Sequence, residues 1–263
     1  MRSAQLKRIF NMPGKSHDLT GQTALITGGS SGIGRAMAEA LGKAGARVWL
    51  ASRDAVMIDR AVHELRSVGI LAEGAQLDVT NRAQVENLTD HIVKRDGKID
   101  TLINSAGVMI KHPVLEMPEE VWDRVISVNL KGTFLCTQAV ARGMIARGYG
   151  RIIHFTSGHV KGNATNSAYS ASKGGVEAFT RSFAAELKQL NVDVTINAVE
   201  PGGTDTPMWR RGKSAEYIEQ ALQSGRIRPA NSVASTIVYL ASRASAVVNG
   251  QVIERRAKPP PGS

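Results

Sequence analysis

Short apolar runs alternate with segments of helical period along nearly the whole chain. The first run is Thr23–Thr27 and the second lies at 47–51; between them Ile33, Met37 and Leu41 recur at helical spacing. Continuous apolar runs are typical of strands buried on both faces, and their alternation with helices predicts parallel βαβ units. We therefore expect an α/β fold with one doubly wound parallel sheet of about seven strands and helices on both faces.

The same alternation continues to residue 253. Further helices are expected near 56–68, 81–94, 118–147, 168–190 and 231–241, and further strands near 72–77, 99–103, 151–155, 192–199 and 251–253. A polar stretch at 204–228 precedes the last helix and predicts a lid over one edge of the sheet.

The positive charge gathers in three segments. The net charge is +10, and residues 1–20, 209–228 and 250–263 carry +8 of it. We expect a basic N-terminal extension at 1–19, one α/β domain at 20–254 and a basic, proline-rich tail at 255–263. Basic ends and one basic loop do not make a nucleic-acid-binding face, so no nucleic-acid partner is expected.

Cysteine use and hydropathy indicate the compartment. The single cysteine, Cys136, cannot form an internal disulfide, which favours a reducing, cytoplasmic location. No stretch approaches the roughly 20 apolar residues of a membrane helix, and the first residues lack the apolar core of a secretory signal. The six histidines show no metal-ligand spacing, so no metal site is expected.

A glycine-rich turn at 27–34, with the sequence TGGSSGIG, joins the first strand to the first helix. Such a turn lets backbone N–H groups approach a pyrophosphate at a helix N-terminus. A plain βα turn also uses glycines, and only the flanking strand and helix favour dinucleotide binding. The cofactor-binding residues expected here are Gly28, Ser30, Ser31, Gly32, Ile33 and Gly34.

The end of the second strand bears on the type of cofactor. Sites for NAD place an acid there for the ribose 2′-hydroxyl, whereas sites for NADP omit it and supply arginine. This chain has Ser52 followed by Arg53. We expect NADP(H) to be preferred, with NAD(H) as the alternative if Arg53 is only a surface residue.

Tyr169 and Lys173 begin an expected helix four residues apart, which places them on one face. A neighbouring cation favours phenolate and would lower the tyrosine pKa from about 10 toward neutrality. A Tyr-x-x-x-Lys pair is a frequent chance match. Its position after the fifth strand, which ends in Thr156 and Ser157, makes it specific.

Taken together, these motifs resemble the short-chain dehydrogenase/reductase family with its Rossmann-like fold, in its NADP(H) type, and are similar to 3-oxoacyl-carrier-protein reductase-like members. The resemblance runs from Leu19 to Ile253. The motifs stand in the family's order: the loop at 27–34, Asp78, NSAG at 104–107, Asn129, Ser157, Tyr169 with Lys173, and PG at 201–202 with Thr206.

The resemblance implies roles for individual residues. Tyr169 would be the general acid or base, Lys173 would bind the nicotinamide ribose, Ser157 would bind the substrate oxygen, and Asn129 would hold a water that passes protons to Lys173. Asp78 and Val79 would hold the adenine, while Asn104 and Ala106 would flank the adenosine ribose. The further cofactor-binding residues implied are Gly107, Pro201, Gly202, Thr204 and Thr206.

The chain departs from the family in three places. NSAG replaces the usual NNAG, the acidic-glycine ending near the C-terminus is absent, and Ser157 lies one residue closer to Tyr169 than in most relatives. Strict counting would select Thr156 as the substrate-binding hydroxyl. We expect the shortening to lie in the turn at 158–167, where length varies cheaply, and Ser157 to keep the role.

Weaker signals surround these motifs. His154 is expected in or beside the sheet, whereas His159 and Lys161 are candidates to face the substrate. The apolar candidates for a substrate pocket are Met109, Met208 and Trp209. In the expected lid, an anionic or carrier-bound substrate would be met by Arg210, Arg211 and Lys213.

We therefore expect an NADP(H)-dependent oxidoreductase that interconverts a carbonyl and a secondary alcohol by hydride transfer, with a small-molecule substrate and no membrane association. The alternative is a non-catalytic nucleotide-sensing or scaffold protein on the same fold. The long helices at 118–147 and 168–190 resemble those through which family members form homotetramers or homodimers.

Overall fold

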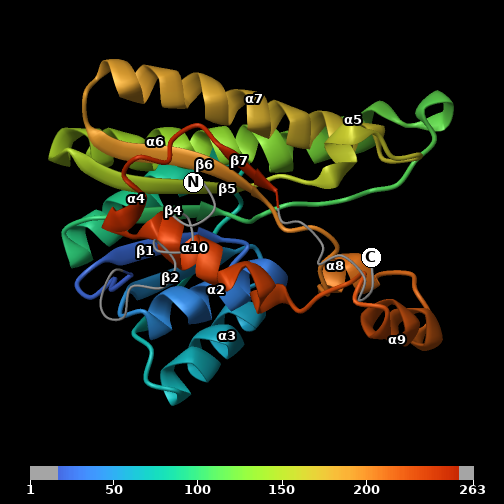
Figure 1. The fold of residues 1–263 in the computed structure, drawn as a ribbon, viewed down its shortest axis with the longest axis horizontal. Helices are drawn as coiled ribbons and strands as arrows, with labels where there is room; N and C mark the ends of the chain where they lie inside the picture. The colour runs from blue at the N-terminus through green and yellow to red at the C-terminus, as the bar shows by residue number, and fades with distance from the viewer. Residues whose placement is uncertain (1–16, 255–263) are drawn as a thin grey trace, which may run out of the picture.

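The computed structural model describes residues 17–254 and contains a seven-stranded, fully parallel sheet (Figure 1). The strand order is β3-β2-β1-β4-β5-β6-β7, so the chain runs outward from β1 to β3 and then crosses to β4 on the other side. This confirms the doubly wound α/β fold. The strands are β1 Thr23–Thr27, β2 Arg47–Ser52, β3 Ala72–Gln76, β4 Thr101–Asn104, β5 Tyr149–Phe155, β6 Asp193–Glu200 and β7 Val252–Glu254.

Helices cover both faces of the sheet (Figure 1). One face carries α2 Gly32–Lys43, α3 Ala55–Ser67 and α10 Ala234–Ala241, and the other carries α4 Arg82–Asp96, α6 Gly132–Arg147 and α7 Ser167–Gln189. The shorter helices are α5 Glu119–Ile126, α8 Pro207–Arg210 and α9 Ala215–Gln223.

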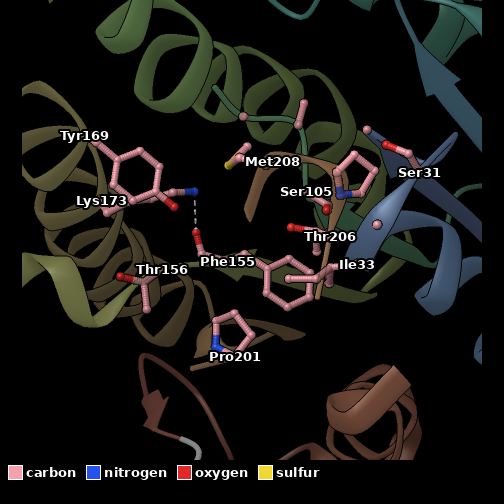
Figure 2. A pocket seen from close by; sticks show the side chains of 15 residues that line it. Ser31, Ile33, Ser105, Phe155, Thr156, Tyr169, Lys173, Pro201, Thr206 and Met208 are labelled. Atoms are coloured by element: carbon pink, nitrogen blue, oxygen red, sulfur yellow. Dashed lines mark hydrogen bonds between the residues drawn. The ribbon is translucent and has the colours of Figure 1, made fainter. Parts of the chain in front are cut away.

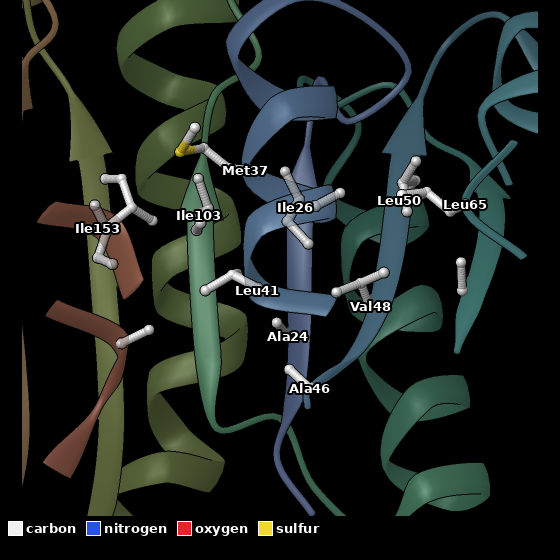
Figure 3. Packing of buried hydrophobic residues seen from close by; sticks show 14 of the residues in the cluster. Ala24, Ile26, Met37, Leu41, Ala46, Val48, Leu50, Leu65, Ile103 and Ile153 are labelled. Atoms are coloured by element: carbon white, nitrogen blue, oxygen red, sulfur yellow. The ribbon is translucent and has the colours of Figure 1, made fainter. Parts of the chain in front are cut away.

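Each face of the sheet has its own apolar core. Figure 3 shows the first, where Ile26 and Leu50 of the sheet meet Met37 and Leu41 of α2. All four side chains are at most 2% exposed. Because both faces are buried, the central strands are apolar at successive positions, as the continuous runs in the sequence predicted.

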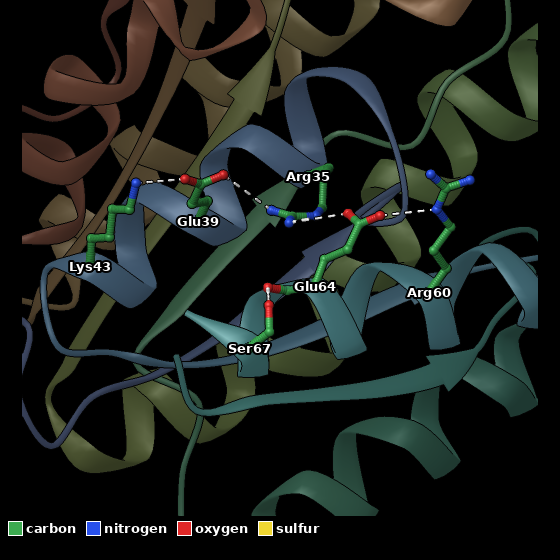
Figure 4. Close-up of polar contacts among 6 residues, drawn as sticks. All are labelled: Arg35, Glu39, Lys43, Arg60, Glu64 and Ser67. Carbon is green, nitrogen blue, oxygen red and sulfur yellow. Dashed lines mark hydrogen bonds and ion pairs between the residues drawn. The ribbon is translucent and has the colours of Figure 1, made fainter. Parts of the chain in front are cut away.

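Surface ion pairs connect the two helices beside the glycine-rich turn (Figure 4). Arg35 of α2 reaches Glu39 at 3.4 Å on its own helix and Glu64 at 3.5 Å on α3, and Lys43 and Arg60 add one pair each. Exposed pairs contribute little individually, typically ~0–1 kcal/mol. Their effect here is to link α2 to α3 through one guanidinium.

The region 118–147, expected to be helical throughout, contains a change of helix type. Helices α5 and α6 are joined by a π-helical turn at Ser127–Lys131. Asn129 lies in the middle of this turn, and its backbone carbonyl accepts a hydrogen bond from the Thr133 hydroxyl at 2.8 Å. Such π turns widen the backbone locally and are common at functional positions.

The expected lid at 204–228, called the flap below, contains two helices, α8 and α9. Both begin with side-chain caps: Thr206 accepts from the Trp209 amide, and Ser214 accepts from the Tyr217 amide. The two ends of the flap are joined by a parallel bridge between Thr204 and Arg228. The flap is therefore a closed loop anchored at its base.

The two basic ends predicted from the sequence lie mostly outside the described residues: 1–16 of the extension and the whole tail at 255–263. Within 17–254, none of the helices has the length and apolar character needed to cross a membrane.

Candidate active site

Three adjoining cavities lie at the carboxyl edge of the sheet. The loop cavity, about 370 Å³, extends from the glycine-rich turn to the end of β2. The central cavity, about 170 Å³, shares Gly28, Ser31, Ala106 and Gly107 with it. The outer cavity, about 310 Å³, shares Tyr169, Thr206 and Met208 with the central one and extends under the flap. The three form one continuous path.

The glycine-rich turn has the geometry that a dinucleotide requires. Gly28 has φ +65°, and a Cβ there would lie 2.8 Å from the Ala106 amide nitrogen; a Cβ on Gly34 would overlap the Gly28 carbonyl. Ser31 begins α2 but makes no side-chain capping bond, and the first turn of α2 has no acidic residue. The helix N-terminus is thus open to an anion. These residues fit the pyrophosphate of a dinucleotide.

The far end of the loop cavity is polar. It is lined by Ser52 and Arg53 after β2, and by Asp78 and Val79 after β3. Asp78 accepts hydrogen bonds from the amide and hydroxyl of Thr80, at 2.9 and 2.7 Å. Partial burial alone would raise the Asp78 pKa, but these bonds and the nearby cations Arg124 and Arg53 lower it. The carboxylate therefore stays ionised.

Tyr169 and Lys173 face the central cavity from one side of α7, as their spacing predicted (Figure 2). Lys173 is 7% exposed, and its Nζ donates to the Phe155 carbonyl at the end of β5, at 2.8 Å. The ammonium lies 5.8 Å from the centre of the Tyr169 ring. This bond fixes α7 against the catalytic end of β5.

The pKa values differ from the sequence-based expectation in one respect. Burial lowers the pKa of Lys173 to about 8. Burial also raises the pKa of Tyr169, and a hydrogen bond with Ser157 only partly offsets this. The expected lowering of the tyrosine pKa by Lys173 is therefore wrong for these side chains alone. The physical reason is that Lys173 points to the Phe155 carbonyl while the phenol lies in a low-dielectric wall.

The two hydroxyl residues after β5 have different partners. Thr156 is 2% exposed and donates to Glu177 of α7 at 2.8 Å. Ser157 lines the outer cavity, lies 2.9 Å from His159 Nδ1 and hydrogen-bonds to Tyr169. Thr156 also lines the central and outer cavities, but its hydroxyl is bonded to Glu177, whereas the Ser157 hydroxyl interacts with the phenol.

Asn129 is fully buried behind the central cavity. Its side chain accepts from the Val108 amide at 2.8 Å and donates to the Val108 carbonyl at 2.9 Å and to Ser172 at 3.0 Å. The amide is therefore fully occupied in holding the segment after β4 against α7. Its backbone carbonyl accepts from the Thr133 hydroxyl at 2.8 Å.

The remaining predicted residues divide between the cavities. Pro201 and Thr206 line the central cavity, whereas Gly202 and Thr204 line only the outer one. Asn104 lines none of the three: its amide donates to Thr137 behind the sheet, and Ser105 stands at the central cavity instead. The outer cavity also receives four of the weaker candidates: Met109, His159, Met208 and Trp209.

Two predicted neighbours of the site lie elsewhere. His154 is fully buried in β5 between Thr137 and Thr180, at 3.1 and 3.0 Å, as expected for a histidine of the sheet. Burial lowers its pKa to about 3, so it is neutral. Lys161 pairs with Glu254 at 2.9 Å and does not line the outer cavity.

Comparisons with known proteins decide the family. The short chain dehydrogenase family matches residues 22–216, which is more than half of the chain. The protein belongs to the short-chain dehydrogenase/reductase family. The general activity predicted from the sequence, interconversion of a carbonyl and an alcohol with a nicotinamide cofactor, is thereby confirmed.

Three relatives illustrate the range of the family around this chain. It is 37% identical to 3-oxoacyl-acyl-carrier-protein reductase of Thermotoga maritima, covering 89% of this chain and 96% of that one. It is 35% identical to 5-keto-D-gluconate 5-reductase of Escherichia coli, covering 89% and 94%. A solved actinorhodin polyketide ketoreductase with NADPH superposes with a TM-score of 0.83 at 35% identity, covering 89% and 95%.

Some residues of this reductase site were not found by sequence reasoning. Glu200 lines the outer cavity and Ser172 supports Asn129, but neither stands out in the sequence as more than a strand-end acid and a helix serine. Arg211 was expected to face the substrate, whereas it lines the loop cavity. The end of β6, the packing of α7 and the path of the flap reveal these three positions, in that order.

The lowered pKa of Lys173 predicts a pH-dependent stability. The unfolded chain keeps the ordinary value of about 10.4, so between pH 8 and 10 the unfolded state binds more protons and stability rises with pH. Relative to Lys173→Met, the free energy of unfolding of the unliganded protein should increase by roughly 2 kcal/mol over this range. Urea unfolding at pH 7.5 and 9.5 measures it.

Lys188→Met provides the control, because Lys188 lies exposed near the end of the same helix. It should follow the pH dependence of the wild type. If Lys173→Met does so too, Lys173 keeps an ordinary pKa in the folded protein.

Proposed function

We propose that the protein is an NADP(H)-preferring carbonyl reductase or alcohol dehydrogenase in which Tyr169 exchanges a proton with the substrate oxygen. The observation that carries the proposal is the meeting of Tyr169, Ser157 and Lys173 where the central and outer cavities join. The central cavity continues into the loop cavity, so a dinucleotide in one would place its reactive end beside the phenol. No observation favours a non-catalytic scaffold.

The chain itself supplies orientation and proton transfer. When bound, the nicotinamide cofactor exchanges a hydride with the carbonyl carbon. The Ser157 hydroxyl holds the substrate oxygen, and the Tyr169 hydroxyl donates its proton to that oxygen in reduction or accepts one in oxidation. The raised pKa of Tyr169 keeps the phenol protonated before cofactor binds, ready to act as an acid.

Lys173 and Asn129 form the rear of this proton path. With a pKa of about 8, Lys173 is mostly protonated at neutral pH and can both release and regain a proton. The backbone carbonyl of Asn129, in the π turn, would hold the water that the family resemblance implies. The filled side-chain amide keeps that carbonyl in the π turn.

The outer cavity sets the substrate class. Met109, Met208 and Trp209 give it an apolar wall that fits the body of a carbonyl compound. Of the three flap cations expected to meet an anionic substrate, Arg210 is paired with Asp205 and Arg211 lines the loop cavity. Lys213 lies over the Trp209 ring, and partial burial, followed by the nearby charge of Lys111, lowers its pKa. An anionic or carrier-bound group would extend toward these two lysines.

The proposal also covers the location of the protein in the cell and its oligomeric state. A buried, unpaired Cys136 fits a reducing cytoplasm. The outer layer of α6 and α7 carries partly exposed aromatic side chains, with Phe134 packed edge-on against Phe179 at 6.0 Å. We propose that a second copy covers this layer, giving a homodimer or homotetramer.

Tyr169→Phe tests the mechanism. It keeps the ring and removes the proton-transferring hydroxyl, so turnover should fall by roughly 10²–10⁴ while NADPH still binds. Nicotinamide absorbance with a panel of ketones and alcohols measures turnover, and calorimetry measures cofactor binding. Tyr149→Phe is the control, since its buried hydroxyl has no partner and stands at the opposite end of β5; near-normal turnover in Tyr169→Phe would refute the assignment.

The choice between the two hydroxyl residues has its own test. Ser157→Ala should lower kcat far more than Thr156→Val, because Ser157 stands beside the phenol and Thr156 is bonded to Glu177. Both variants should unfold at similar urea concentrations to the wild type. The reverse ranking of kcat would assign the substrate oxygen to Thr156.

Cofactor preference follows from Ser52 and Arg53. NADPH should bind more tightly than NADH, and Arg53→Gln should weaken NADPH roughly 10- to 100-fold, as expected for a charge-assisted bond to phosphate, while leaving NADH nearly unchanged. Arg60→Gln, on the outer side of α3 and paired with Glu64, should change neither. Tighter binding of NADH by the wild type would contradict the preference.

A further inference from the structure

The three cationic side chains at the start of the flap, Arg210, Arg211 and Lys213, differ in their interaction partners. Arg210 makes two bonds to Asp205, at 2.5 and 2.7 Å, which use the carboxylate fully. Lys213 donates to the Trp209 carbonyl and covers its ring. The guanidinium of Arg211, which follows Arg210 in the sequence, has no hydrogen bond or ion pair to any residue of the described chain.

Arg211 nevertheless lines a defined space. It is a wall residue of the loop cavity, together with Ser30 and Ser31 of the glycine-rich turn and Ser52 and Arg53 of β2. The flap thus contributes Arg211 to the wall of this cavity. Arg211 is not among the residues that line the outer cavity, where the substrate would bind.

The loop cavity holds two arginines and two carboxylates. The carboxylates are engaged locally: Asp54 caps α3 by accepting from the Met57 amide at 3.0 Å, and Asp78 accepts from Thr80. Neither arginine, Arg53 or Arg211, has an ion pair within residues 17–254, although Arg53 is near enough to Asp78 to help lower its pKa. Two guanidinium groups without an ion pair in this part of the chain and an open helix N-terminus favour a ligand with more than one phosphate charge.

The flap can hold Arg211 in place only because its base is fixed. Asp205 donates its amide to the Arg228 carbonyl at 2.8 Å, and Arg228 returns a bond to Gly203 at 3.0 Å. The Thr206 cap then sets the direction of α8, to which the exposed Asp205–Arg210 pair adds little. Arg211 follows α8 directly, so its position is tied to this anchored base.

We propose that Arg211 binds a phosphate of the dinucleotide and thereby fastens the flap over the bound cofactor. The inference rests on the proposed function, since it needs a dinucleotide in the loop cavity. Met208 and Trp209 lie on α8 just before Arg211 and line the outer cavity. Cofactor binding would therefore also fix the positions of Met208 and Trp209, which form part of the wall against which the substrate packs.

Calorimetric titration of NADPH and NADH into three variants tests the proposal. Arg211→Gln should raise the Kd of NADPH about tenfold. Arg210→Gln, its neighbour with a different partner, should stay within about twofold of the wild type. If the loss is confined to NADPH, Arg211 binds the 2′-phosphate; an equal loss for both cofactors assigns it to the pyrophosphate, and either outcome supports the proposal.

Arg53→Gln separates this inference from the proposed function. Wild-type protein that binds neither cofactor would refute the proposed function itself. If Arg53→Gln weakens NADPH while Arg211→Gln changes neither Kd, the cofactor site stands and the role of Arg211 is wrong. Equal weakening by Arg210→Gln and Arg211→Gln would also overturn it, because the effect would then come from the fold of the flap.

Hydrogen exchange gives a second readout that does not depend on turnover. At saturating NADPH, amides of 208–225 should be protected in the wild type and in Arg210→Gln, and less protected in Arg211→Gln. The amides of α2 serve as the internal control, since the glycine-rich turn binds the cofactor in all three proteins. Equal flap protection in Arg211→Gln and wild type would show that Arg211 does not fasten the flap.

Discussion

The parallel hydrogen bonding of the sheet places the carboxyl ends of β1, β2, β4, β5 and β6 along one edge. The glycine-rich turn, Arg53, Ala106, Ser157 and Pro201 each follow one of these ends, although they are far apart in the sequence. Because each strand is buried on both faces, its register is fixed by packing rather than by solvent exposure. The whole candidate site depends on this edge, and the helices serve to hold it rigid.

Burial at the junction of β5 and α7 determines the chemistry. Moving a lysine into this interior lowers its pKa, and moving a phenol into the same wall raises its own, so the two proton affinities move apart and the Lys173 ammonium becomes the stronger acid. The bond from Lys173 to the Phe155 carbonyl makes burial of the ammonium tolerable. A dinucleotide beside them would change these surroundings further, which links cofactor binding to proton transfer.

The flap differs from the rest of the site because it is held by few contacts beyond its base. Its two short helices rest on caps and on the pair between Asp205 and Arg210, and most of its residues are partly or fully exposed. Segments of this kind gain order from what they bind. Trp209 of α8 lines the outer cavity, and Arg211, just after α8, lines the loop cavity. In our proposal, this short segment would therefore respond to both ligands.

The sequence by itself determined the parallel α/β fold, the glycine-rich turn and the pairing of Tyr169 with Lys173, because apolar periodicity, βα turns and i, i+4 spacing act over short stretches of chain. It also favoured Ser157, but the reason, the bond from Thr156 to Glu177, joins residues 21 apart. Only the tertiary structure decided the direction of the pKa of Tyr169, the turning of Asn104 toward Thr137 and the separation of Arg210 from Arg211. These depend on burial and on partners brought together from different elements, which no local pattern encodes.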